Sequence, residues 1–310
     1  MNLPALKCKN RRLFNITGIP AFFITIFLLT AVSCGQSPEE KSFVDYPVLT
    51  EENEYPELTD IKAIFYDLYS PVKAHRLFQQ INVVFDPDIL NPVDNVFRYS
   101  SSNKIALNLG IYGADMSFCH MFGQTQEAIN YMSAVYRLSE RLGIAGNIIT
   151  EAENARESTI YNPDSLFNIA SNIYIAADRQ LKESGREGAA SLILAGGWIE
   201  AFYIACSFYD KENPDSNLEE QILTQKYSLD RLTAMLSNHQ NNEFIAKYLL
   251  MIRQLQHKYD SVEILFSQDD LIIDTTKKTI ESDKPKFVYT ATDIEEIIRL
   301  VTLIRQEMVN

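Results

Sequence analysis

Cysteine, tryptophan and basic residues are all scarce for a chain of this length. Among 310 residues there are four cysteines and one tryptophan, which excludes a small fold held together by disulfide bonds. Lys and Arg together number 28 against 41 Asp and Glu, a formal net charge of −13. Sequence-independent binding of nucleic acid needs clustered basic side chains that displace counterions. We therefore expect no nucleic-acid partner.

The motifs of common cofactor and metal sites are also missing. The sequence contains no Gly-x-Gly-x-x-Gly, no Gly-x4-Gly-Lys-Ser/Thr and no His-Glu-x-x-His. The acidic run 269–274 lacks the glycine and glutamate that a calcium-binding loop needs at its sixth and twelfth positions. Neighbouring helical side chains diverge by about 100°, so the adjacent Cys119 and His120 are not a nucleophile and its base. We expect no cofactor and no metal.

The first 33 residues have the layout of an export signal. Four basic residues precede an apolar run over residues 19–32. Fourteen helical residues reach about 21 Å, short of the ~30 Å hydrocarbon core of a bilayer, which favours a cleaved signal over a spanning helix. The segment Ala31-Val32-Ser33-Cys34 then resembles the lipobox of bacterial lipoproteins, with Ala31 in place of the commoner Leu. The alternative is an ordinary secretory signal followed by an incidental cysteine.

The lipobox resemblance implies cleavage before Cys34 and acyl chains, such as palmitate, on that cysteine. It also implies an anchor in the outer membrane of a Gram-negative envelope, on the periplasmic face or at the cell surface. We therefore predict a lipoprotein signal peptide over residues 1–33, an acidic flexible tether over 34–56, and a single helical domain over 57–310. Without its signal the chain keeps 24 basic and 41 acidic residues, a formal charge of −17, which favours solubility.

From Leu58 onward the apolar residues recur with a helical period, which predicts an all-α fold. Such a fold is a helical bundle or a set of stacked helical hairpins. The insert near 262–289 is expected to be irregular or a β-hairpin, with short strands at 271–273 and 287–289. Helices are expected near 58–69, 103–121, 124–142 and 145–158, from Asn162 to Gly185, from Asn213, across 242–264, and from a capping box at Thr292 and Glu295 to the C-terminus.

Two predicted helices, 106–122 and 191–208, are apolar nearly all round and belong in the centre of the fold. An offset of 86 residues aligns their glycines and aromatic residues, and an amphipathic helix with a Thr-Gln pair follows each. We infer a duplicated helical hairpin. The two helices are expected to lie side by side, because small residues serve close backbone approach. The expected contact residues are Gly110, Gly113, Ala114, Gly197 and Ala201.

The segment Tyr112-Gly113-Ala114-Asp115, with residues 126–131 after it, is similar to stretches of uncharacterised helical envelope lipoproteins. The resemblance covers about a tenth of the chain and implies no activity. It agrees with the lipobox and adds no chemistry.

Each of the two apolar helices carries one carboxylate, Asp115 or Glu200, and this pair is the main candidate for a site. A buried carboxylate must be paired, hydrogen-bonded or protonated, because desolvating a lone charge is costly. The two acids are expected near Tyr112, Trp198 or a buried base, where they share a proton, hold a metal or serve the structure alone. Cys119 and Cys206 occupy nearly equivalent places and are expected as free thiols, a disulfide being the alternative.

These observations predict a membrane-anchored envelope protein whose helical domain binds a small ligand or an envelope protein. Two alternatives stay open. The first is an envelope enzyme that uses Asp115 and Glu200 as acids or metal ligands. The second is a structural scaffold built from helical repeats.

Overall fold

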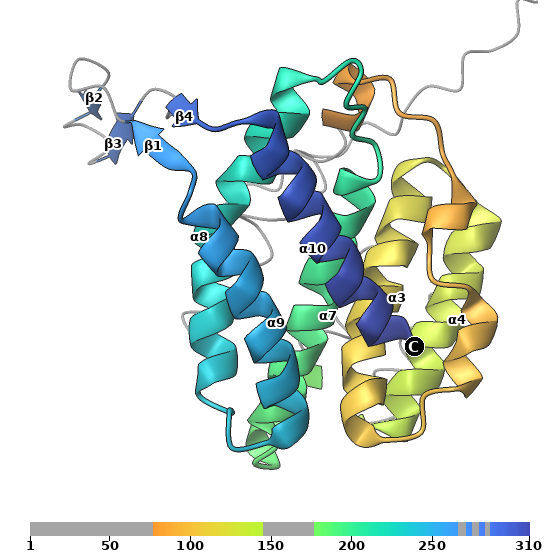
Figure 1. Cartoon of the computed structure of the whole chain (residues 1–310). Coiled ribbons are helices and arrows are strands. Elements are labelled where there is room, and N and C mark those ends of the chain that lie inside the picture. The colour runs from red at the N-terminus through yellow and green to blue at the C-terminus, as the bar shows by residue number, and fades with distance from the viewer. Residues whose placement is uncertain (1–76, 145–176, 266–270, 275–278, 283–285) are drawn as a thin grey trace, which may run out of the picture. The chain divides into compact units, whose positions relative to one another are not determined.

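The structure is a computed structural model that describes residues 77–144, 177–265, 271–274, 279–282 and 286–310 (Figure 1). All of these residues belong to one compact unit, Phe43–Asn310. The expected signal peptide and tether, the helices near 58–69 and 145–158, and the helix start at Asn162 lie outside the described residues. The described part is dominated by helices, so the all-α prediction is confirmed.

The first two long helices match the sequence prediction to within one residue. Helix α3 is Ser102–Met121, and the Ser101 hydroxyl caps it by accepting a 3.2 Å hydrogen bond from the Lys104 amide. Helix α4 is Thr125–Arg141. Between them Gly123 has a φ of +64°, a left-handed conformation that glycine adopts without steric cost. The tight reversal makes α4 run back along α3.

The next three helices differ in how they begin. After the described helical residues 177–183, and after Gly185, α7 is Glu187–Cys206, and its N-cap residue, Arg186, makes no capping hydrogen bond with its side chain. Helix α8 is Ser216–Ser237, with Asp215 as its N-cap, and α9 is Glu243–Tyr259, with Asn242 as its N-cap. The expected helix starts near Asn213 and 242 are therefore confirmed. The first of these two helices begins two residues later than expected.

The C-terminal helix α10, Ala291–Val309, begins two residues earlier than predicted. Its capping box is formed by Thr290 and Asp293, so the predicted box of Thr292 and Glu295 is wrong. The Asp293 carboxylate accepts a 2.7 Å hydrogen bond from the Thr290 amide, and the Thr290 hydroxyl accepts one from the Asp293 amide at 3.3 Å. Lys258 also binds Asp293 at 2.6 Å, which favours this register over the alternative.

The insert near 262–289 is a pair of short antiparallel ladders. Strand β1, Glu263–Leu265, pairs with β4, Lys286–Val288, and β2, Leu271–Asp274, pairs with β3, Thr279–Ser282. The predicted strands at 271–273 and 287–289 both exist. They do not pair with each other, because each has its partner in a segment that sequence periodicity did not identify.

Helices α3 and α7 lie side by side in the centre and run in the same direction (Figure 1). Helix α4 packs on α3, whereas α8 and α10 pack on α7, and α9 lies against both α8 and α10. Two short 3-10 helices, η2 (Pro87–Ile89) and η3 (Val93–Phe97), precede α3. By length and composition α7 could cross a membrane, but most of it is buried inside the protein, as is usual for a core helix.

The α3–α7 contact is reciprocal. A Cβ atom on Gly110 would lie 1.9 Å from the Ile193 carbonyl oxygen, and one on Gly196 would lie 1.9 Å from that of Leu107. The two backbones thus meet at glycine in both directions, and the predicted pairing of these helices is confirmed. Adding 86 to the numbers of Leu107 and Gly110 gives Ile193 and Gly196, so one contact is the counterpart of the other. The same offset aligns the two sequences.

The reciprocal contact supports the duplication hypothesis for the central pair of helices. The helices that follow are less alike, because Thr125 is the first residue of α4 whereas Thr224 lies well inside α8. The two Thr-Gln pairs are therefore not in equivalent places.

Candidate functional site

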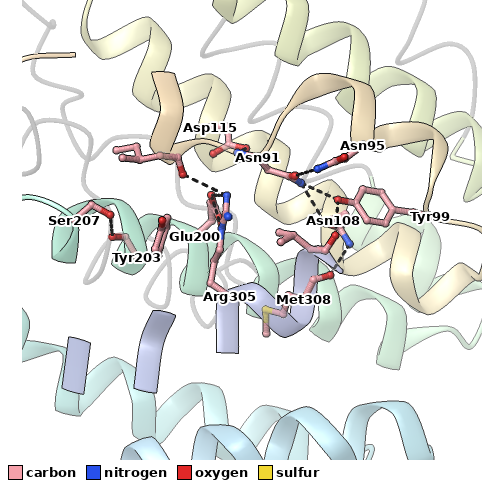
Figure 2. A network of polar contacts seen from close by, with 12 residues as sticks. Asn91, Asn95, Tyr99, Asn108, Asp115, Glu200, Tyr203, Ser207, Arg305 and Met308 are labelled. Carbon is pink, nitrogen blue, oxygen red and sulfur yellow. Dashed lines mark hydrogen bonds and ion pairs between the residues drawn. The ribbon is translucent and has the colours of Figure 1, made fainter. Parts of the chain in front are cut away.

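The fold brings the two predicted carboxyl groups together in the centre of the bundle (Figure 2). Asp115 of α3 and Glu200 of α7 both have an exposed fraction of 0%. Their side chains are within hydrogen-bonding reach of each other. This meeting follows from the parallel α3–α7 pair, in which residues about 86 apart lie at the same height.

Arg305 of α10 neutralises Glu200. Its guanidinium donates from Nε to Oε2 and from Nη2 to Oε1, both at 2.9 Å, so the ion pair is bidentate. The same Nη2 donates to the carbonyl oxygen of Ile89 at 3.3 Å, and the guanidinium carbon lies 4.7 Å from the centre of the Tyr203 ring. Nε, Nη2 and the face of the guanidinium thus each contact another part of the protein.

One arginine faces two acids, which leaves one negative charge uncompensated and favours the protonated form of Asp115. Burial first, and the charge of Glu200 second, raise the pKa of Asp115 well above its usual range, which Arg305 only partly offsets. Asp115 Oδ2 accepts a 3.3 Å hydrogen bond from the Asn91 amide, while Oδ1 receives none from any donor in the described part of the chain. A protonated Asp115 donating to Glu200 satisfies this geometry.

The polar centre continues along α3 as a network of amide and hydroxyl groups. Asn91 Nδ2 donates to the Tyr99 hydroxyl at 3.0 Å, and the Tyr99 hydroxyl donates to the Val309 carbonyl at 3.3 Å. Asn108 Nδ2 donates to the Met308 carbonyl at 3.2 Å. Side chains of the α3 region thereby satisfy the last carbonyl groups of α10, which have no partner within their own helix.

Two other residues predicted for this site have different roles. The Tyr112 hydroxyl donates to the Pro92 carbonyl at 3.0 Å rather than to a carboxylate. The Trp198 ring packs edge-on against Phe202, with ring centres 5.1 Å apart, and its buried Nε1 has no hydrogen-bond partner among the described residues. The polar site therefore comprises Asp115 and Glu200 as predicted, but not Trp198.

Sequence reasoning missed Arg305 and Asn108, although each leaves a signal. Arg305 lies four residues after Val301 and three before Met308, on the buried face of α10. Asn108 lies seven residues before Asp115, two turns along the same face of an otherwise apolar helix. In both cases a polar residue occupies a position where the helical spacing of the buried residues predicts an apolar one.

The chemistry open to this centre is limited by its burial. Among the described residues no three His, Cys, Asp or Glu side chains group as a metal site. Cys119 and Cys206 are free and buried, and burial raises the pKa of both thiols, which disfavours the reactive thiolate. Both acids are fully buried, and the ion pair of Arg305 with Glu200 fastens α10 to α7.

A second candidate site is an open pocket at the end of the bundle where α3 and α7 terminate. Its volume is about 480 Å³, within the usual range for small-molecule sites. Aliphatic and aromatic side chains of residues 81–89 and Phe208 line it, and its surface is about equally polar and apolar. Behind them Phe118 stacks on Phe85 with ring centres 5.5 Å apart, and on Phe208 at 6.0 Å. Asp86 and Ser207 add polar groups to the lining.

No family description, curated protein or solved structure matches this chain.

Proposed function

We propose that this chain is a lipid-anchored protein of a Gram-negative cell envelope whose helical domain is a binding module. The observation that carries the proposal is the segment Ala31-Val32-Ser33-Cys34 directly behind a basic and then an apolar stretch. One acyl chain holds a protein to a membrane only marginally, whereas two or three hold it firmly. The acylated cysteine would therefore suffice as an anchor without a spanning helix.

Binding is favoured over catalysis by the contrast between the two candidate sites. The two acids that would serve an enzyme have an exposed fraction of 0%, and Glu200 is already bound by Arg305. A substrate has no access to them in this conformation. The pocket at the end of the bundle is open, and its lining combines apolar side chains with polar groups that a small ligand can reach.

Replacement of Cys34 tests the anchor. The full chain is expressed in a Gram-negative host with an alkyne-labelled palmitate, and the mature protein is analysed by mass spectrometry and membrane fractionation. The parent is expected to be labelled, membrane-bound and cut before Cys34. Cys34→Ala should remain uncleaved and unlabelled.

Cys8→Ala is the matched control, because this cysteine lies in the basic start of the signal and would be removed with it. It should behave as the parent does. A Cys34→Ala variant that is still acylated and cut at the same bond would refute the anchor.

A further inference from the structure

We infer that the pocket at the end of the bundle binds an organic cation with an apolar body, such as an alkyl- or arylalkylammonium compound. The inference deepens the proposed function and rests on the helical domain being a binding module, but not on the lipid anchor. It follows from three features of the pocket, namely its charge, the end of α7 and its aromatic rings.

The charge of the lining is negative. Asp86 contributes a carboxylate, and none of the described residues that line the pocket is Lys or Arg. Asp86 is exposed and its Oδ1 accepts a 2.9 Å hydrogen bond from the Asp88 amide, which fixes the side chain at the start of η2. The whole chain carries a formal charge of −13, which adds a long-range attraction for cations.

The C-terminus of α7 lies at the pocket. Ser207 and Phe208, which line the pocket, directly follow Cys206, the last residue of this helix. The C-terminus of a helix carries about half a negative charge, which a nearby cation stabilises. Proteins often place a basic residue in the last turn for this purpose, and α7 has none there.

The walls suit the apolar part of such a ligand and the cation as well. Ile81, Val83 and Ile89 supply aliphatic surface, while Phe85 and Phe208 supply aromatic rings. The face of an aromatic ring attracts an ammonium group electrostatically, and recognition of quaternary ammonium ligands uses this contact. An anionic ligand of the same shape would be repelled by Asp86 and by the negative end of α7.

The experiment compares three probes with one body and different heads: 4-phenylbutylammonium, 4-phenylbutanol and 4-phenylbutyrate. Binding to the full chain in a neutral detergent is measured by calorimetric titration at low salt. The ammonium compound should bind saturably and at least ~5-fold more tightly than the alcohol, a ratio in keeping with one cation–π contact and an exposed ion pair. The carboxylate should bind most weakly. Added salt should reduce the preference for the cation, because the charges involved are near the surface.

Two variants test the location. Asp86→Asn keeps a good capping side chain and removes the charge, and should weaken binding of the ammonium probe about 3- to 5-fold without affecting the alcohol. Val84→Lys places a positive charge on the pocket rim at a side chain that is 80% exposed, and should weaken the ammonium probe at least as much. Asp94→Asn is the control, because it removes the same charge from the exposed first turn of η3 and should change nothing.

The outcomes separate this inference from the proposal on which it rests. Equal affinities for the three probes would refute the preference for a cation while leaving a binding pocket in place. Parent-like affinity in both Asp86→Asn and Val84→Lys would refute the location. Failure of all three probes to bind would refute the inference altogether, whereas the lipid anchor is tested separately at Cys34.

Discussion

Replacing Asp115 with asparagine should make the protein more stable at neutral pH, although it alters a fully buried polar centre. Asparagine has nearly the same shape, so Oδ1 can accept from the Asn91 amide and Nδ2 can donate to Glu200. These are the hydrogen bonds that a protonated Asp115 makes. The substitution therefore keeps the contacts and removes only the proton that must be bound on folding.

The size of the effect follows from proton linkage. The folded pKa of Asp115 is raised, by burial first and by Glu200 second, above the unfolded value of about 3.9. The contribution of this proton to the unfolding free energy is fully present below about pH 4. It decreases by about 1.4 kcal/mol per pH unit as the pH rises toward the folded pKa. Relative to the parent, the Asp115→Asn variant should gain that amount per unit across this window.

Urea unfolding of the full chain in a neutral detergent at pH 5, 6 and 7 measures the gain. Circular dichroism follows the helices, and fluorescence of Trp198, the one tryptophan of the chain, follows the core two residues from Glu200. The difference in unfolding free energy between variant and parent should increase steadily with pH. The two signals should change together if unfolding has two states.

The control is Asp115→Leu, which removes the proton and the hydrogen bonds together. It should show the same pH trend relative to the parent, but lower stability than Asp115→Asn at every pH. The offset is about 1–3 kcal/mol, the cost of leaving buried polar groups unsatisfied. A difference between Asp115→Asn and the parent that stays constant from pH 5 to pH 7 would show that the folded protein does not hold this proton.

Three further substitutions test other contacts of the fold. Gly110→Ala places a methyl group 1.9 Å from a backbone oxygen of α7 and should lower the unfolding free energy, measured in urea, by at least ~1–3 kcal/mol. Its control is Gly188→Ala, whose methyl group meets the end of a flexible side chain at 3.0 Å. This variant should stay within about 1 kcal/mol of the parent. Equal effects would contradict the close approach of the two helices. Arg305→Met leaves a buried carboxylate unpaired and should cost about 3–5 kcal/mol in the same assay; a loss below 1 kcal/mol would argue against the buried ion pair. Hydrogen bonds from Lys258 first, and from the capping partner second, lower the pKa of Asp293, so its contribution is present above the usual carboxyl pKa and lost in acid. Asp293→Asn should therefore cost about 1 kcal/mol at pH 7 and less below pH 4 by thermal unfolding.

Much of the fold was predictable because the signals for a helix lie within its own stretch of sequence. The spacing of apolar residues placed α3 and α4 to within one residue, and the turn at Asn213 placed the start of α8 to within two. The helix expected across 242–264 ends five residues early, at Tyr259. The start of α10 was missed because two overlapping Thr-x-x-acid patterns compete, and contact with Lys258, 35 residues away, favours one of them. Strand pairing was missed because short strands gain their stability from partners that periodicity does not reveal.

The candidate site was predictable in part for the same reason. Asp115 and Glu200 were found because a charge in an apolar helix is a local anomaly, and their meeting followed from the matching glycines. Arg305 was not found, because its helix is amphipathic and a basic residue at the edge of the apolar stripe is ordinary there. The pocket involves residues 81–89, whose apolar side chains acquire a role only when the ends of α3 and α7 are brought beside them.

The reciprocal glycine contact also constrains when the core can form during synthesis. Leu107 and Gly196 are 89 positions apart, so α3 leaves the ribosome well before the helix that covers it. At about 5–20 residues per second the interval is about 4–18 s, long compared with the microseconds that a helix needs to form. During that time α4 can already cover one side of α3, but the face that packs on α7 has no partner. The nascent chain should therefore depend on a holding chaperone until residue 206 has emerged.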